Sequence, residues 1–324
     1  MNPIQSALAA ITLGPAVAFE NLTMVPLLVK MPSGIRPKPD RRQRPRTVDR
    51  PRYVLLDDAL AARAAEITEV SEQGSVPELR FVNHGTSPVL LIDGQELLGA
   101  KQNRIVNLTI LAPAETTLTI PVSCVESGRW SARSRAFSAA PRTQYASGRA
   151  QRVAQVTKSI VDEGVRMSDQ AAVWADIARK SARLCASSKT GAMEAIFDRH
   201  ASFIDRSVDA FEPQEFQVGV IFAINDSILG LDLFDDGATL RRVLPKLVRA
   251  AAVDALDRPS EPAAESKVSA RACELFLAQL SSAAQHSSRA LGLGEDVRLS
   301  SPSIAGAALV VDDAVVHLSA FASA

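Results

Sequence analysis

Several kinds of residue are scarce in this chain of 324 residues, and each scarcity narrows the possible functions. Only three cysteines occur, and the wide spacing of Cys124, Cys185 and Cys273 predicts neither a disulfide framework nor a paired zinc motif. No uninterrupted apolar run reaches the ~18 residues of a membrane-spanning helix. Basic and acidic residues are equal in number, 36 of each, so no overall charge favours nucleic acid or an anionic membrane. We therefore predict a cytoplasmic protein without a membrane or nucleic-acid partner.

The motifs of common nucleotide-dependent and hydrolytic enzymes are also missing. GxGxxG, the P-loop, HExxH and GxSxG do not occur, and the four histidines are too scattered to predict a zinc or iron cluster. Asp232, Asp235 and Asp236 offer carboxylates, but a hard cation needs more converging oxygens than this run guarantees. The sequence thus predicts no metal site and leaves any cofactor unknown.

Residues 1–130 carry a β-rich pattern. Short apolar runs such as ELRFVN, PVLLID and TLTIPVSCV are separated by turn signals, among them His84-Gly85 and Asp93-Gly94. Several short strands at this spacing indicate an antiparallel sandwich or open barrel. Residues 31–52 are loaded with proline and arginine and have little to bury, so we expect a disordered insertion there.

Residues 131–324 look mainly helical. One-sided apolar patterns predict helices, and two β-hairpins are expected near 216–234 and 304–321. The resulting prediction is an α+β protein in which the β-rich N-terminal half packs against a helical C-terminal half with one or two hairpins. The two halves are either separate domains or one continuous domain.

A polar segment, residues 94–107, lies between two apolar strand-like runs. Its side chains combine positive charge with amide donors and acceptors, and they belong to Glu96, Lys101, Gln102, Asn103 and Arg104. Such a set suits a phosphate or carboxylate beside a sugar or base. The alternative is that these groups form a structural hydrogen-bond network across the sheet.

The following strand and loop add four candidates. Cys124 is either a small buried apolar residue or a nucleophilic thiolate, and Glu126 is either a general base or a structural ion-pair partner. Arg129 and Trp130 open a stretch, residues 127–161, with seven basic and no acidic residues. They form either a platform for a base or nucleotide ring or, for Trp130, a packing anchor.

Gln170 and Trp174 lie one turn apart in a predicted helix, so they share a face and can reach the same cleft. The predicted site is therefore a cleft between the two halves of the chain, lined by residues from the polar segment, the strand after it and this helix.

Four blocks in order resemble a known family. The first two are GQELLGAKQNR from Gly94 and IPVSCVE from Ile120, the latter followed by Gly128-Arg129-Trp130; the last two are SDQ-VW from Ser168 and LDLFD from Leu231. The chain resembles the ADP-ribosylglycohydrolase- and rhodanese-phosphatase-superfamily-associated protein domain over most of residues 15–257. This family is named from its gene neighbourhoods, so the resemblance implies a place near NAD and ADP-ribose metabolism without implying a mechanism.

Three functions follow as hypotheses. The leading one is accessory or regulatory binding of a phosphorylated or nucleotide-like small molecule. The second is a hydrolase or transferase that acts on such a ligand through Glu126 or Cys124. The third is a protein-interaction module that uses residues 31–52, so the sequence leaves open whether the protein is an enzyme.

Overall fold

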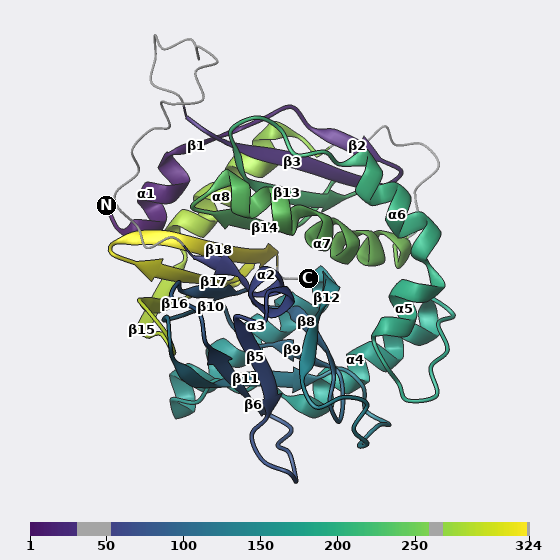
Figure 1. Ribbon diagram of the computed structural model, residues 1–324. Coiled ribbons are helices and arrows are strands. Elements are labelled where there is room, and N and C mark those ends of the chain that lie inside the picture. Colours follow the sequence, from purple (N-terminus) through teal and green to yellow (C-terminus); the bar gives the residue numbers. More distant parts are fainter. Residues whose placement is uncertain (31–52, 259–267, 323–324) are drawn as a thin grey trace.

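The computed structural model describes residues 1–30, 53–258 and 268–322, which form eight helices and eighteen strands (Figure 1). The helices are α1 (Pro3–Ala9), α2 (Leu56–Ala61), α3 (Ala146–Glu163), α4 (Gln170–Arg183), α5 (Glu194–Arg199), α6 (Ala201–Ala210), α7 (Gly237–Leu256) and α8 (Ala270–Ser282). Side chains cap the N-termini of three of these helices. Asn2 accepts a hydrogen bond from the backbone amide of Gln5 at the start of α1. Asp169 accepts one from Ala172 at the start of α4, and Ser269 accepts one from Ala272 at the start of α8.

The largest sheet is antiparallel and draws strands from both ends and the middle of the chain. Its order is β1-β3-β13-β14-β18-β17-β16-β15, with β2 also paired to β3 (Figure 1). The strands are β1 (Ile11–Leu13), β2 (Val17–Phe19), β3 (Leu22–Val29), β13 (Gln217–Ile224), β14 (Ser227–Phe234), β15 (Ala284–Arg289), β16 (Glu295–Ser301), β17 (Ile304–Val311) and β18 (Ala314–Ala322).

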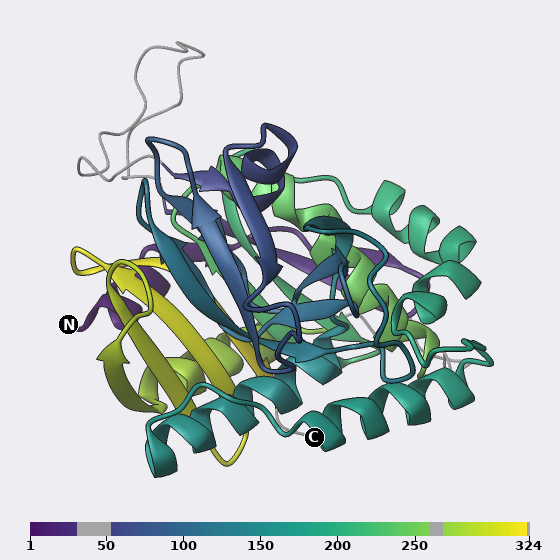
Figure 2. The ribbon, with the colours of Figure 1, turned by 60° about the horizontal axis from the view of Figure 1, so that its bottom comes forward.

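Two smaller sheets come from residues 54–143. A six-stranded sheet has the order β12-β8-β9-β11-β6-β5, and a three-stranded sheet has the order β10-β7-β4. The strands are β4 (Val54–Leu55), β5 (Ala65–Glu69), β6 (Glu78–Asn83), β7 (Val89–Leu91), β8 (Gln95–Gly99), β9 (Arg104–Val106), β10 (Ile110–Ala112), β11 (Thr117–Cys124) and β12 (Phe137–Thr143). Figure 2 shows these blue strands as a layer beside the yellow C-terminal strands.

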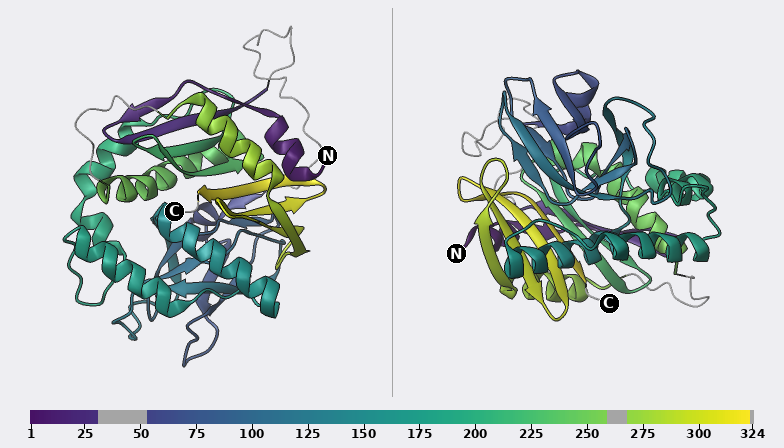
Figure 3. Two further views of the ribbon diagram at one scale, coloured as in Figure 1. Left: turned by 180° about the vertical axis from the view of Figure 1, so that it is seen from behind. Right: turned by 90° about the horizontal axis from the view of Figure 1, so that it is seen from below.

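Helices cover the large sheet on both faces. One apolar cluster joins β3, β13 and β14 to α7 and α3, and a second joins the opposite face of the same strands to α1 and α8. Every residue of β13 is buried, and all of them except Gln217 form the continuous apolar run VGVIFAI. The long helices α3 and α4 run along one side of the molecule (Figure 3), where α3 contacts β17 and β18 and α4 contacts β11.

The predicted division into a β-rich half and a helical half is wrong. Strands run through the whole described chain, and the largest sheet joins residues 11–29 to residues 217–234 and 284–322. The chain is therefore a mixed α/β protein with large antiparallel sheets. The two predicted hairpins correspond to β13–β14 and β17–β18, whereas the polar strands β15 and β16 were not predicted. The insertion predicted at 31–52 lies outside the described residues.

Candidate functional site

The polar segment comprises the strands β8 and β9 and the loop at residues 100–103 that joins them. Gly94 and Gly99 both have positive φ angles, 79° and 125°, which favour glycine. A Cβ atom at Gly94 would also lie 2.9 Å from the Arg149 side chain. The turn at residues 100–103 folds Gln102 and Asn103 against the end of β11, beside Cys124 and Glu126.

Glu126, which follows β11, forms a buried ion pair with Arg129 and contacts the loop at residues 100–103. Its Oε2 atom lies 2.6 Å from Arg129 Nη2 and accepts a 3.2 Å hydrogen bond from the Asn103 amide. Its Oε1 atom accepts a 2.8 Å hydrogen bond from Thr190. Burial raises the pKa of this carboxyl, but the hydrogen bonds from Arg129 and Thr190 outweigh it and hold the pKa below its usual value. Glu126 is thus a fully engaged carboxylate.

Arg129 adds hydrogen bonds that hold the loop in shape. It donates to the carbonyl oxygens of Ala100 at 2.7 Å and Ser131 at 3.0 Å, and to Asn103 Oδ1 at 3.1 Å. These hydrogen bonds connect loop segments to one another. They are the kind of contact expected if Glu126 and Arg129 form a structural ion pair.

Cys124 lies at the end of β11 with its thiol beside Gln102. The Sγ atom is 3.1 Å from Gln102 Oε1, and Gln102 also donates from Nε2 to the Glu126 carbonyl at 2.9 Å. Burial raises the pKa of the Cys124 thiol, although the positive charge of Arg104 lowers it in part. The group is therefore a neutral thiol at neutral pH.

Gln170 links helix α4 to the same strand. Its side-chain amide accepts from the Cys124 amide and donates to the Cys124 carbonyl, each at 2.8 Å. The side chain thus pairs with β11 as a neighbouring strand would, and it brings α4 and Trp174 to the cluster. The Trp174 indole is close enough to Cys124 to lower the pKa of the thiol.

Arg104 is the least satisfied member of the cluster. The residue is fully buried, and its Nη1 atom donates to Gln102 Oε1 at 2.9 Å. Its Nε and Nη2 atoms have no hydrogen-bond partner within the described chain, and neither does Trp174 Nε1. Burial lowers the pKa of Arg104, while the neighbouring side chains of Cys124 and Glu69 raise it.

Trp130 covers this arginine from the solvent side. Its ring centroid lies 5.7 Å from the Arg104 guanidinium carbon and 5.3 Å from Lys101 Nζ, and the residue is 48% exposed. Lys101 also donates to the Glu72 carbonyl. Two cations therefore lie against one aromatic ring at the surface end of the cluster.

Glu96 lies apart from Arg104, because the two residues occupy neighbouring strands and point to opposite faces of the sheet. Its Oε2 atom accepts a 2.5 Å hydrogen bond from Arg142, which also donates to Glu194 at 2.8 Å. Its Oε1 atom has no partner in the described residues. Burial raises the pKa of Glu96 to about 7, despite the opposing charge of Arg142.

The model of the ARG and rhodanese-phosphatase-superfamily-associated protein domain matches residues 10–321. The chain belongs to this family. The match extends the resemblance seen in the sequence to almost the whole chain, including the C-terminal strands. No curated protein and no solved structure matches the chain.

A second polar cluster, which the sequence did not predict, is deeply buried. Arg149 on α3 donates to Asp93 and Asp232 through hydrogen bonds of 2.8–3.2 Å, and Arg152 donates to Asp93 at 3.3 Å. His317 Nε2 lies 3.1 Å from Asp232. The stretch 127–161 contains seven basic and no acidic residues, so any buried arginine in it needs a carboxylate from a distant part of the chain. This was the sequence feature that could have indicated the cluster.

Asp93, Asp232 and His317 bring possible metal ligands within 4.8 Å of one another. Arg149 joins the two carboxylates and already supplies the positive charge between them. The other two aspartates considered for a metal are engaged elsewhere: Asp235 accepts a hydrogen bond from Tyr53 at 2.6 Å, and Asp236 caps α7.

None of the helices in the described ranges combines the length and apolarity that a membrane crossing requires.

Proposed function

We propose that this protein binds a phosphorylated or nucleotide-like small molecule at Arg104, in an accessory or regulatory role within NAD or ADP-ribose metabolism. The observation that supports the proposal is the buried guanidinium of Arg104 with two unpartnered donors. A buried donor without an acceptor costs about 1–3 kcal/mol, and more when it is charged. An anionic ligand would remove that cost.

The unpartnered donors have the geometry that oxyanions prefer. Nε and Nη2 lie on one edge of the guanidinium, so their N–H bonds are nearly parallel and can bind two oxygens of one phosphate or carboxylate. Gln102 holds the opposite part of the group through Nη1, which fixes the orientation of the free edge. Lys101 supplies a second positive charge beside Trp130.

The two tryptophans favour a ligand that has a flat ring as well as an anion. Trp130 is half exposed against Arg104, and Trp174 presents an unpartnered indole N–H near Cys124. Aromatic faces stack on nucleotide bases without regard to base identity. The family name, which refers to ADP-ribosylglycohydrolases, motivates the choice of an ADP-ribose derivative.

The catalytic alternative has less support. Both oxygens of Glu126 are engaged in hydrogen bonds or an ion pair, and its lowered pKa opposes a role as general base. Cys124 has a raised pKa, which opposes a role as thiolate nucleophile. The interaction-module hypothesis depends on residues 31–52, which lie outside the described residues. The cytoplasmic location stays a prediction; the cysteines are free thiols, as a reducing compartment favours.

Intrinsic fluorescence gives a specific test, because the chain has only two tryptophans and both lie at the proposed site. We expect ADP-ribose, AMP or pyrophosphate to change the emission in a saturable manner. Arg104→Gln should weaken binding by about 10-fold or more, since a hydrogen bond to a charged group contributes about 1.5–3 kcal/mol.

The matched control is Arg241→Gln, which removes the same charge from an exposed position on α7. This variant should bind with unchanged affinity. An equal loss of affinity in both variants would mean that the ligand is attracted only by the overall charge of the protein. The absence of a saturable fluorescence change with all three ligands would refute the proposal.

A further inference from the structure

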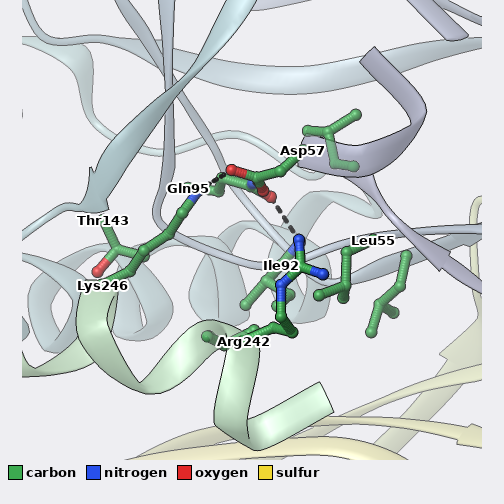
Figure 4. A pocket seen from close by; sticks show the side chains of 10 residues that line it. Leu55, Asp57, Ile92, Gln95, Thr143, Arg242 and Lys246 are labelled. Atoms are coloured by element: carbon green, nitrogen blue, oxygen red, sulfur yellow. Dashed lines mark hydrogen bonds and ion pairs between the residues drawn. The ribbon is translucent and has the colours of Figure 1, made fainter. Parts of the chain in front are cut away.

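A small cavity lies between α7, the β4–α2 segment and the ends of β8 and β12, outside the Arg104 site. Its volume is about 60 Å³. Leucine and isoleucine side chains form much of its wall, including Leu90 and Ile92. Asp57, Gln95 and Lys246 supply polar groups to the same space (Figure 4). A space of this size admits a ligand of a few non-hydrogen atoms.

Lys246 reaches this cavity from α7 and is held there by a carboxylate. Its Nζ atom donates to Asp57 Oδ1 at 2.5 Å, and its side chain is only 13% exposed. Gln95 donates to the other oxygen of Asp57, also at 2.5 Å, so the carboxylate is fixed in place. The amine therefore sits beside an apolar wall with one oriented acid–base partner.

Burial makes this amine easier to deprotonate. Loss of hydration lowers the pKa of Lys246, and the charges of Asp57 and Asp58 reduce the effect without reversing it. A desolvated lysine in an apolar pocket is the form in which proteins use the amine as a nucleophile toward carbonyl compounds.

We propose that Lys246 forms an imine with a small aldehyde or α-keto acid that enters this cavity. Lys246 first passes its ammonium proton to Asp57. The neutral amine then attacks the carbonyl carbon, the electron pair of the C=O π bond moves to the oxygen, and a proton moves from the nitrogen to this oxygen to give a carbinolamine. Asp57 returns its proton to the hydroxyl group, which leaves as water while the nitrogen lone pair forms the C=N bond, so that the product is a protonated imine and Asp57 is again a carboxylate.

The surroundings favour a carbonyl compound over carbon dioxide, which also reacts with neutral lysine. An iminium ion is positive and would lie against the Asp57 carboxylate, where it is stabilised as the ammonium is now. A carbamate is negative and would be repelled by the same group. Arg242 lies one turn before Lys246, lines the cavity and forms an ion pair with Asp58. Its remaining guanidinium donors can bind a carboxylate on the ligand.

Reductive trapping tests the inference on the intact chain. The protein is incubated with glyoxylate and cyanoborohydride at neutral pH, and each lysine is scored by peptide mass mapping for the added carboxymethyl group. Lys158 is the internal control: it is exposed on α3, and its hydrogen bond with Asp162 raises its pKa. We expect Lys246 to be modified several-fold faster than Lys158.

Two variants complete the experiment. Lys246→Arg keeps the positive charge beside Asp57 and should remove the fast reaction, while Asp57→Asn should slow it because the proton carrier is lost. Modification of Lys246 at the rate of Lys158 or below would overturn the proposal, and so would fast labelling that persists unchanged in Asp57→Asn. The Arg104 site is not involved, so the outcome is independent of ligand binding there.

Discussion

The buried carboxyl of Glu96 should make stability depend on pH in a defined window. Its pKa is raised from 4.5 to about 7, chiefly because burial disfavours the charged form. Below pH 4.5 the group is protonated in the folded and the unfolded chain. As the pH rises toward 7, the unfolded chain ionises first, so the folded state loses stability; above 7 both forms are ionised and the loss is complete.

The size of the effect follows from the shift. About 2.5 pKa units correspond to at most about 3 kcal/mol, since each unit is 1.36 kcal/mol. Glu96→Gln has the same shape and does not ionise. We therefore expect the free energy of unfolding of the variant, minus that of the wild type, to increase by up to about 3 kcal/mol between pH 4.5 and 7.5 and to stay constant above.

Urea unfolding at a series of pH values measures this difference, and taking the difference between the two proteins removes the titration of all other groups. A difference that does not change with pH would refute the reasoning. A difference that falls as the pH rises would mean that the ion pair with Arg142 outweighs the cost of burying the charge.

Three further predictions concern the packing around the sites. Arg149→Met leaves buried Asp232 without an arginine partner and leaves Asp93 with Arg152 alone, so it should lower the free energy of unfolding by about 3–5 kcal/mol, measured by urea denaturation; a loss below 1 kcal/mol would contradict the ion-network description. In the native protein a thiol reagent should modify exposed Cys185 quickly, and the two other cysteines only after unfolding; fast modification of two or three thiols would contradict their burial. Gln170→Ala removes both hydrogen bonds to the Cys124 backbone and should lower the melting temperature, with a cost of about 1–3 kcal/mol, whereas an unchanged melting temperature would show that this link is dispensable.

Local patterns predicted many elements, because they depend on neighbouring residues. The hairpins expected near 216–234 and 304–321 correspond to β13–β14 and β17–β18, whose strands are connected through short turns. The sheet order depends on pairings between distant segments, such as β3 with β13, which no local pattern contains. Strand β15 was missed because it is exposed and polar, so it lacks apolar alternation.

The same distinction applies to the candidate site. Gln102 and Arg104 were both predicted to line the site, and they are joined by a 2.9 Å hydrogen bond. The separation of Glu96 from Arg104 could not be read from the segment, because the loop at residues 100–103 changes the direction of the chain. The partners of Arg149 come from β14 and from the segment before β8, and only the assembled sheets bring them together.

The proposed function requires that Arg104 is kept for a ligand and not for stability. The most direct measurement is the melting temperature of Arg104→Met and of the wild type, each with and without saturating ADP-ribose. We expect the variant without ligand to be at least as stable as the wild type, because a buried cation without an ion-pair partner is removed, and we expect ADP-ribose to stabilise only the wild type. A variant that melts well below the wild type and is still stabilised by ADP-ribose would contradict the claim.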